Sequence, residues 1–263
     1  MNKISAKALT MFIKNKQKRK FVYKLLTNNI KLDDYMLKTK VPLVLGYSIK
    51  GENNKIIIIE NGVEREIREG EKIEGLDIII NGDNNIIKLE LPIKAKNSKI
   101  EIGNDNAVVD VGSSQAFYGV FIRCCYGNGQ YCKIGKGTTI YGAGFILDAD
   151  GGCIVGDDCM FSNSIRIWTT DGHSIIDSDS KKILNDTNGY VTIGDHCWVG
   201  EAVRITKNAR IGNNCIIGGG AVACKDYKED NCIIAGNPGK IVKRGISWDR
   251  KNTINYKNSF EGA

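Results

Sequence analysis

Aliphatic side chains recur every six residues in the C-terminal half of the chain. This column consists of Ile193, Val199, Ile205, Ile211 and Ile217. A period of six fits neither the 3.6-residue turn of an α-helix nor the two-residue alternation of a strand. It indicates a chain that turns a corner about every six residues and stacks short strands into a parallel β-helix, with the aliphatic column along the axis.

Small side chains form a second column, four residues after each aliphatic. Its members are Cys197, Val203, Ala209, Cys215 and Ala221. Glycine directly follows most of the aliphatics, and glycine reaches corner conformations that strain other residues. The two columns together predict an all-β solenoid with a narrow interior.

The same pattern recurs upstream with less regularity. The expected inward positions are Ile134, Ile140, Ile146, Val155, Phe161 and Ile167, with Thr138, Gly144 and Cys159 in the small column. Degenerate turns at 80–83 and 102–105 place the start of the solenoid near residue 78. We therefore expect an N-terminal part (1–77) with a helix and short strands, a solenoid (78–248) and a C-terminal tail (249–263).

Residues 4–29 predict a basic, amphipathic helix. One interpretation is a helix that caps the end of the solenoid, and the other is a helix that docks on a membrane surface or a partner. Capping is favoured, because the sequence supplies no second membrane signal.

Composition narrows the cellular setting. The 263 residues are 42% hydrophobic, enough for a substantial core. No stretch approaches the roughly 18 apolar residues of a membrane span, and the first residues lack a secretory hydrophobic segment. We expect a cytoplasmic protein.

The cysteines point to packing rather than to metal binding. Three of the nine occupy the small inward column, and no two cysteines are separated by two residues as in common zinc sites. With only two histidines in the chain, we expect no metal site.

The net charge of +7 favours an anionic partner. No nucleic-acid-binding module is recognisable, so nucleic acid is not expected. A phosphorylated small molecule fits the charge equally well.

A break in register marks the candidate site. Ile167 and Ile193 are 26 positions apart, which is not a multiple of six, so a loop at 172–190 must leave the prism. His173 lies at its start, where an imidazole could act as a general base near neutral pH. The alternative is a surface histidine without a role. His196 lies within a regular coil and is assigned no chemistry.

Three motifs, in this order, resemble the hexapeptide-repeat acyltransferases. They are Asp171–Ile175 (DGHSI), Trp198–Gly200 (WVG) and Ile234–Val242 (IAGNPGKIV). Within the family the chain is most similar to bacterial O-acetyltransferases of capsular polysaccharide and sialic acid, and to galactoside and maltose acetyltransferases. The resemblance covers about residues 100–248.

This resemblance implies a left-handed β-helix, a homotrimer and acetyl-CoA bound between neighbouring prisms. It further implies that His173 is the catalytic base and that Trp198 of an adjacent subunit walls the pocket. Asp171 either orients the imidazole or serves only as a turn residue. Pantetheine and phosphate contacts are implied for Gly200, Gly219, Cys224, Lys225, Lys240 and Lys243. Where relatives commonly carry serine after the WVG step, this chain has Glu201.

The expected activity is acetyl transfer from acetyl-CoA to a sugar hydroxyl of a bacterial surface glycan. One alternative is N-acetylation of an amino-sugar nucleotide, and another is a non-catalytic binding scaffold. On this interpretation the basic N-terminal helix would contact a membrane or a glycan-synthesis complex. A β-helix carbonic anhydrase needs three histidine ligands and is excluded by two histidines.

Overall fold

A computed structural model describes residues 47–185 and 189–259 of the chain. The chain divides into two compact units at Leu45 and Gly46, and every described residue belongs to the second unit. The helix predicted at 4–29 lies outside the described residues.

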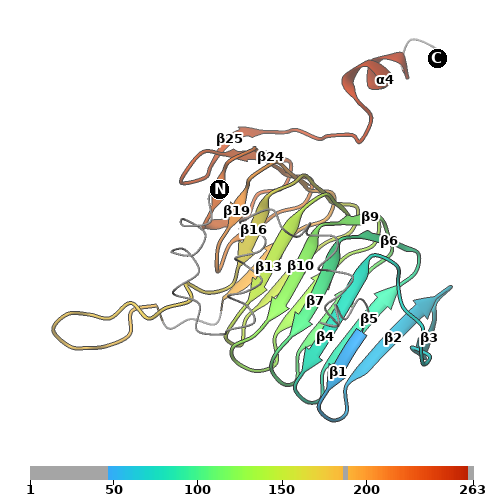
Figure 1. The fold of residues 1–263 in the computed structure, drawn as a ribbon. Coiled ribbons are helices and arrows are strands. Elements are labelled where there is room, and N and C mark those ends of the chain that lie inside the picture. The colour runs from blue at the N-terminus through green and yellow to red at the C-terminus, as the bar shows by residue number, and fades with distance from the viewer. Residues whose placement is uncertain (1–46, 186–188, 260–263) are drawn as a thin grey trace, which may run out of the picture. The chain divides into compact units, whose positions relative to one another are not determined.

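The described residues form a solenoid of three sheets, in which successive strands along the chain visit one sheet after another (Figure 1). The first sheet has the order β1 (Tyr47–Lys50), β4 (Leu76–Asn81), β7 (Ser98–Ile102), β10 (Val120–Cys124), β13 (Ala143–Leu147), β16 (Ile165–Trp168), β19 (Arg204–Ile205) and β22 (Val222–Ala223). All of its strand pairs are parallel, because each strand is one full coil away from the next.

The second and third sheets are built in the same way, each with one antiparallel strand at an edge. The second has the order β23 (Asp226–Tyr227), β20 (Arg210–Ile211), β17 (Tyr190–Ile193), β14 (Gly152–Val155), β11 (Tyr131–Ile134), β8 (Val108–Val111), β5 (Ile86–Glu90), β2 (Lys55–Glu60) and β3 (Val63–Glu66). The third has the order β25 (Lys240–Arg244), β24 (Cys232–Ala235), β21 (Ile216–Ile217), β18 (Trp198–Val199), β15 (Met160–Phe161), β12 (Thr139–Ile140), β9 (Ser114–Tyr118) and β6 (Ile93–Lys96). β3 and β25 fold back on β2 and β24.

The two predicted columns fill the axis of the solenoid. All five aliphatics from Ile193 to Ile217 are buried, and so are all five small residues from Cys197 to Ala221. Val155, Phe161 and Ile167 of the earlier block are fully buried as well. Burial of this continuous apolar column is what holds the short strands together, since each coil contacts only its neighbours.

Two inward positions predicted in the earlier block are wrong. Ile146 and Gly144 lie on the outer face of β13, whereas Ala143, Phe145 and Leu147 point inward. The cause is coil length: Lys99 pairs with Phe121, 22 positions later, whereas Arg204 pairs with Val222, only 18 later. Longer coils carry five-residue strands, in which a two-residue alternation decides which side chain faces the core.

The solenoid also begins earlier than the expected residue 78. β1 pairs in parallel with β4, and β2 pairs in parallel with β5, so the stacking reaches back to Tyr47. A coil of 31 residues, which includes the β3 hairpin, hides this repeat from a search for hexads.

Most of the cysteines are packing residues, and the three predicted for the inward column, Cys159, Cys197 and Cys215, are among them. All nine are free, and seven of them are buried. Burial raises the pKa of Cys153 to about 12, so this thiol stays protonated at neutral pH.

The C-terminal tail returns across the third sheet and ends in the short helix α4 (Thr253–Asn258). Trp248 stacks on the ring of His196 at 4.3 Å between centroids and donates a hydrogen bond from Nε1 to the His196 carbonyl at 2.7 Å. Arg250 pairs with Asp158 at 2.9 Å, and the Asp158 carboxylate also contacts His196 Nδ1 at 2.7 Å. His196 therefore anchors the tail to the coil.

Candidate functional site

The predicted loop leaves the solenoid between β16 and β17. Arg166 of β16 pairs with Arg204 of β19, 38 positions later, whereas the coil that follows has only 18 residues. The extra residues of the longer coil form the loop. An antiparallel bridge between Ile176 and Ile183 closes the loop into a hairpin, which protrudes from the prism in Figure 1. The register break in the sequence thus marked a real excursion.

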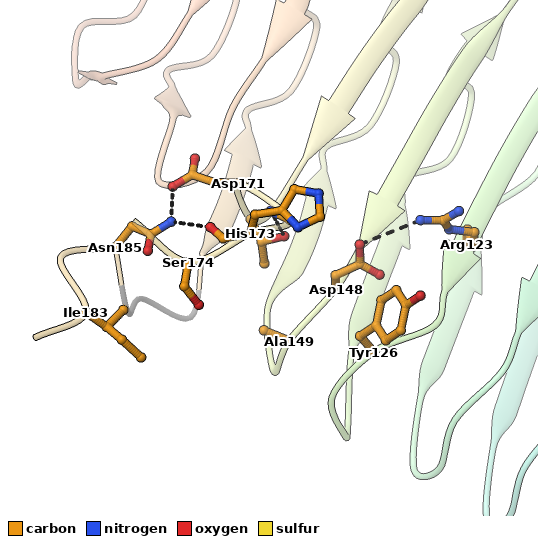
Figure 2. A pocket seen from close by; sticks show the side chains of 11 residues that line it. Arg123, Tyr126, Asp148, Ala149, Asp171, His173, Ser174, Ile183 and Asn185 are labelled. Carbon is orange, nitrogen blue, oxygen red and sulfur yellow. Dashed lines mark hydrogen bonds and ion pairs between the residues drawn. The ribbon is translucent and has the colours of Figure 1, made fainter. Parts of the chain in front are cut away.

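His173 lies at the base of this loop, at the mouth of a pocket of about 450 Å³ (Figure 2). The pocket walls are Arg123, Tyr126, Asp148, Ala149, Thr170, Asp171, Gly172, Ser174, Ile183 and Asn185. The walls combine the loop with the ends of β10 and β13 on the first sheet. Because the His173 side chain is exposed, a molecule in this pocket can reach the imidazole from solvent.

Asp171 holds the loop rather than the imidazole. Its carboxylate accepts hydrogen bonds from Lys207 Nζ and, at 2.8 Å, from Asn185 Nδ2. Asn185 Nδ2 also donates to the His173 carbonyl at 2.8 Å, and its Oδ1 accepts from the Ile175 N–H at 2.8 Å. Asn185 therefore ties both sides of the loop base to Asp171 and fixes the backbone at His173.

The hydrogen bond from Lys207 lowers the pKa of Asp171 below its ordinary 3.8. The stabilisation that this contact gives is complete above pH 3.8, where the carboxyl would be ionised even in the unfolded chain. It is lost only as the pH falls through the lower folded value. The hydrogen bond between Lys207 and Asp171 is therefore kept throughout the neutral pH range.

Arg123 and Asp148 form a wall of the pocket that sequence reasoning missed. Asp148 is 8% exposed, and its Oδ2 lies 3.7 Å from Arg123 Nη2. Within the described residues, Asp148 Oδ1 and Arg123 Nε are buried without a hydrogen-bond partner. The hexad pattern carried no signal for them, because both lie on longer coils.

Trp198 lies on a different face of the solenoid from His173. It is on β18 of the third sheet, 39% exposed, and its ring centroid is 6.2 Å from that of Trp248. The two indoles line a second pocket of about 730 Å³, together with Met160, Ile216 and the tail. Within one chain, the structure therefore brings His173 and Asp171 into one pocket but leaves the third expected catalytic residue, Trp198, in another.

The expected coenzyme contacts lie on the last coils. The two glycines among them, Gly200 and Gly219, differ in exposure and in the space around them. Gly200 is buried, and a Cβ there would lie 2.6 Å from the backbone nitrogen of Gly219. Close stacking of consecutive coils already accounts for glycine at 200. Gly219 is exposed, and a Cβ there would have its nearest contact at 3.4 Å from the Glu201 carbonyl oxygen.

The remaining coenzyme candidates are exposed. Cys224 and Lys225 follow β22 at a corner, and Lys240 and Lys243 lie on β25. The turn before β25 is tied to β22, since the Gly239 N–H donates to the Val222 carbonyl at 2.8 Å. These side chains are therefore available to a ligand along the end of the solenoid.

The sequence of the last coils matches a known family. Residues 190–223 match the model of the bacterial transferase hexapeptide (six repeats). They cover β17 to β22, the part with the most regular columns. These coils are similar to the hexapeptide-repeat family of bacterial transferases.

Two curated relatives of this chain are acetyltransferases by name. The polysialic acid O-acetyltransferase of Escherichia coli O1:K1 / APEC is 37% identical over 123 residues, which are 46% of this chain and 39% of that protein. The galactoside O-acetyltransferase of Lactococcus lactis is 35% identical over 113 residues, which are 42% of this chain and 52% of that protein. The matched part therefore spans about half or less of these two relatives.

Two solved structures share the fold of this chain. The polySia-specific acetyltransferase NeuO matches with a TM-score of 0.66 and 25% identity over 82% of this chain and 99% of that one. The polysialic acid O-acetyltransferase OatWY matches with a TM-score of 0.64 and 28% identity over 82% and 98%. The predicted solenoid, a left-handed parallel β-helix with an extruded loop, is confirmed.

The described residues show neither a metal-binding cluster nor a membrane-spanning helix. No group of three or more His, Cys, Asp or Glu side chains there is arranged to hold a metal ion. No helix among these residues has the length and hydropathy that a membrane span requires.

Proposed function

We propose that this protein transfers acetyl from acetyl-CoA to a sugar hydroxyl of a bacterial surface glycan. The observation that carries the proposal is the place of His173, at the mouth of a polar pocket where the loop leaves the coil. The similarity to a polysialic acid and a galactoside O-acetyltransferase supports the same reaction class.

In this reaction His173 is the general base. Its neutral imidazole takes the proton of the acceptor hydroxyl while the hydroxyl oxygen attacks the thioester carbonyl carbon. The carbon–sulfur bond then breaks, the acetyl group stays on the sugar oxygen, and the imidazolium returns its proton to the departing thiolate. Asp171 acts through Asn185 as a positioning residue, since its carboxylate is committed to Asn185 and Lys207.

The proposed assembly is a homotrimer with sites between subunits. Trp198 is half-exposed on the third sheet, and His173 is on the loop that follows β16 of the first sheet. A cyclic arrangement of three prisms would bring the third sheet of one copy towards the loop of the next, so that Trp198 completes the pocket of its neighbour. There the indole would wall the acceptor or the pantetheine arm.

Coenzyme A is proposed to lie along the last coils. The exposed Gly219 leaves room for a thin pantetheine arm to approach the backbone. The exposed side chains of Cys224 and Lys225 border that path, and the ammonium groups of Lys240 and Lys243 would meet the phosphates.

A matched pair of glycine variants separates coil stacking from coenzyme binding. Gly219→Ala is expected to keep the thermal midpoint of the wild type and to raise the Kd for coenzyme A, because the added methyl has ordinary contacts and narrows the path. Gly200→Ala is expected to destabilise the fold by about 1–3 kcal/mol, because its methyl collides with backbone. Thermal unfolding and calorimetric titration with coenzyme A measure the two effects. An unchanged coenzyme affinity in Gly219→Ala removes this glycine from the proposed path.

An acceptor assay tests the proposed activity. Purified protein is incubated with acetyl-CoA and one acceptor at a time, which is a sialylated sugar, a galactosylated sugar or an amino sugar. The release of free coenzyme A is followed in each reaction. We expect release with hydroxyl acceptors and an ester product that mild base removes. A base-stable amide product would assign the protein to N-acetylation, and failure to bind coenzyme A at millimolar concentration would favour a binding scaffold.

A further inference from the structure

We propose that the C-terminal tail belongs to the candidate site, where Trp248 joins Trp198 in an aromatic wall for the ring of the acceptor sugar. The tail segment 246–252, the strap, holds Trp248 in place from one corner of the solenoid. This inference rests on the proposed function, because Trp198 is the residue proposed to complete a neighbour's pocket. It gives a binding role to a segment that the hexads do not reach.

The strap crosses successive coils at the corner that leads into the third sheet. Its partners lie one or two residues before β24, β21, β18, β15 and β12. The hydrogen-bonded pairs, with donor and acceptor 2.7–3.2 Å apart, are Ile246 with Asn231, Ser247 with Asn214, Trp248 with His196, Arg250 with Asp158 and Arg250 with Gly137. Five neighbouring strands of one sheet therefore fix the course of the strap.

Backbone conformation explains why polar residues stand at this corner. All five corner partners have φ between 51° and 70°, in the left-handed region. Glycine, asparagine, aspartate and histidine enter this region more readily than other residues. Two of these side chains bind the strap directly, since Asn214 Oδ1 accepts from Ser247 and Asp158 Oδ1 accepts from Arg250. The residues that turn the corner thus also form the column to which the strap binds.

Contacts on both sides hold Trp248 within the strap. Its ring stacks on His196 with 12° between the planes, and its Nε1 donates to the His196 carbonyl at 2.7 Å. Arg250 reaches the Asp158 carboxylate through Nε at 3.1 Å and through Nη2 at 2.9 Å. Burial alone would raise the pKa of Asp158, but the hydrogen bonds from His196 and Arg250 outweigh it and lower this pKa below its ordinary 3.8. The ionised carboxylate therefore keeps both partners at neutral pH.

Trp248 and Trp198 are two walls of the pocket of about 730 Å³. Their ring centroids are 6.2 Å apart and their planes are tilted by 47°, so the indoles meet at an angle rather than face to face. Met160 and Ile216 flank Trp198 in register on the third sheet and line the pocket beside it. Both indoles keep part of their surface exposed. A ligand that packs on Trp198 in this pocket therefore also lies beside Trp248.

The polar groups of this pocket fit a sugar ring. Ser247, Asn252 and Thr253 bring hydroxyl and amide groups into its lining. A sugar ring has C–H groups on its face, which pack on an indole, and hydroxyls around its edge, which exchange hydrogen bonds with such groups. An apolar wall with a polar rim matches both parts of the ring.

Charge argues against the phosphate end of coenzyme A as the occupant of this pocket. The two cations of the lining, Arg250 and Lys251, are balanced by two carboxylates, Asp249 in the lining and Asp158 paired with Arg250. Arg250 is also bonded to three backbone carbonyls, which commits its remaining donors. The exposed lysines of the last coils have no such balance within a pocket and remain the better partners for phosphates.

Tryptophan fluorescence tests the wall directly, because the chain has only three tryptophans. Trp168→Phe removes the one on β16, so that the emission comes from Trp198 and Trp248 alone. Sialyllactose, lactose and glucosamine are titrated one at a time into this variant. We expect at least one sugar to shift the emission to shorter wavelength along a saturable curve, since stacking removes the indoles from water. If none of the three changes the emission, the proposal is overturned.

Substitutions in the same background then assign the contact. Trp248→Ala should weaken binding of the sugar about two- to tenfold, the range for a pair of packed rings, and Trp248→Phe should restore most of the affinity. Tyr131→Ala, which removes a part-exposed aromatic side chain from β11 on the second sheet, is the matched control and should leave the affinity unchanged. Calorimetry measures all three. An affinity in Trp248→Ala equal to that of the control would remove Trp248 from the wall.

Arg250→Gln tests whether the strap positions Trp248. Loss of the ion pair with Asp158 should loosen the strap, so we expect emission at longer wavelength without sugar. The acceptor KM should rise as in Trp248→Ala, with kcat and the KM for acetyl-CoA nearly kept. Arg250→Lys should recover part of the loss, because it keeps the charge. Unchanged emission, or a fall in kcat and in the thermal midpoint at an unchanged acceptor KM, would contradict the positioning role.

Activity assays keep this inference apart from the proposed function. If a sugar shifts the emission of Trp168→Phe but receives no acetyl from the wild type, the proposed function fails and the aromatic wall stands. If Trp248→Ala acetylates that sugar with the wild-type KM, the aromatic wall fails alone.

Discussion

Replacing His173 by alanine should reduce acetyl transfer about a hundredfold to ten-thousandfold, the range that a general base contributes. Without the imidazole the acceptor hydroxyl must lose its proton to water as it attacks the thioester. The side chain is exposed at the mouth of the pocket, so its removal leaves the core untouched. Stability should change by less than about 0.5 kcal/mol. Initial rates of coenzyme A release and thermal unfolding measure both effects.

Lys182→Ala is the control for this experiment. Lys182 lies in the same loop and is exposed, so the variant tests whether any change in the excursion lowers activity. It should keep the wild-type rate. Near-normal turnover in His173→Ala, or an equal loss in both variants, would remove His173 from the role of base.

The fold was predictable because the short coils repeat one rule. Between Ile193 and Ala221 each six-residue step returns an apolar side chain to the axis, and every member of both columns is buried. The rule weakens where coils grow to 22 residues, and it misplaced Ile146 and Gly144. In those coils the inward positions follow strand alternation, and the corner positions depend on coil lengths that only strand pairing reveals.

The site was predictable only where it interrupts the repeat. The loop that carries His173 was predicted because the 26 positions between Ile167 and Ile193 are not a multiple of six. Arg123 and Asp148 interrupt nothing. They line the same pocket as His173 because consecutive coils stack, which places residues 25 and 50 positions upstream near the base of the loop. Such neighbours follow from three-dimensional register rather than from local pattern.

Asp171 illustrates the limit of reading a role from adjacency. In the sequence it stands two residues before His173, which left an imidazole partner and a turn residue equally open. The structure instead joins its carboxylate to Lys207, 36 positions later, and to Asn185 at the other end of the loop. Both partners are distant along the chain, so the residues around Asp171 could not identify them.

Mixing two inactive variants should restore activity if the sites lie between subunits. His173→Ala lacks the base and Trp198→Ala lacks the aromatic wall, and the two residues lie on different faces of one chain. In randomly mixed trimers, a site is intact when the loop comes from a Trp198→Ala chain and the indole from a His173→Ala neighbour. That combination forms at about a quarter of the sites, so about a quarter of wild-type activity is expected after joint unfolding and refolding.

Each variant refolded alone is the control and should stay at its own low rate. A mixture that shows only the average of the two single variants would place His173 and Trp198 in separate functions. Light scattering should show trimers in every sample. Because the two variants are refolded together, such trimers contain both kinds of subunit, and a lack of recovered activity then means that the two variants do not complement each other. Recovery near a quarter would require that the loop of one prism and the third sheet of its neighbour form one site.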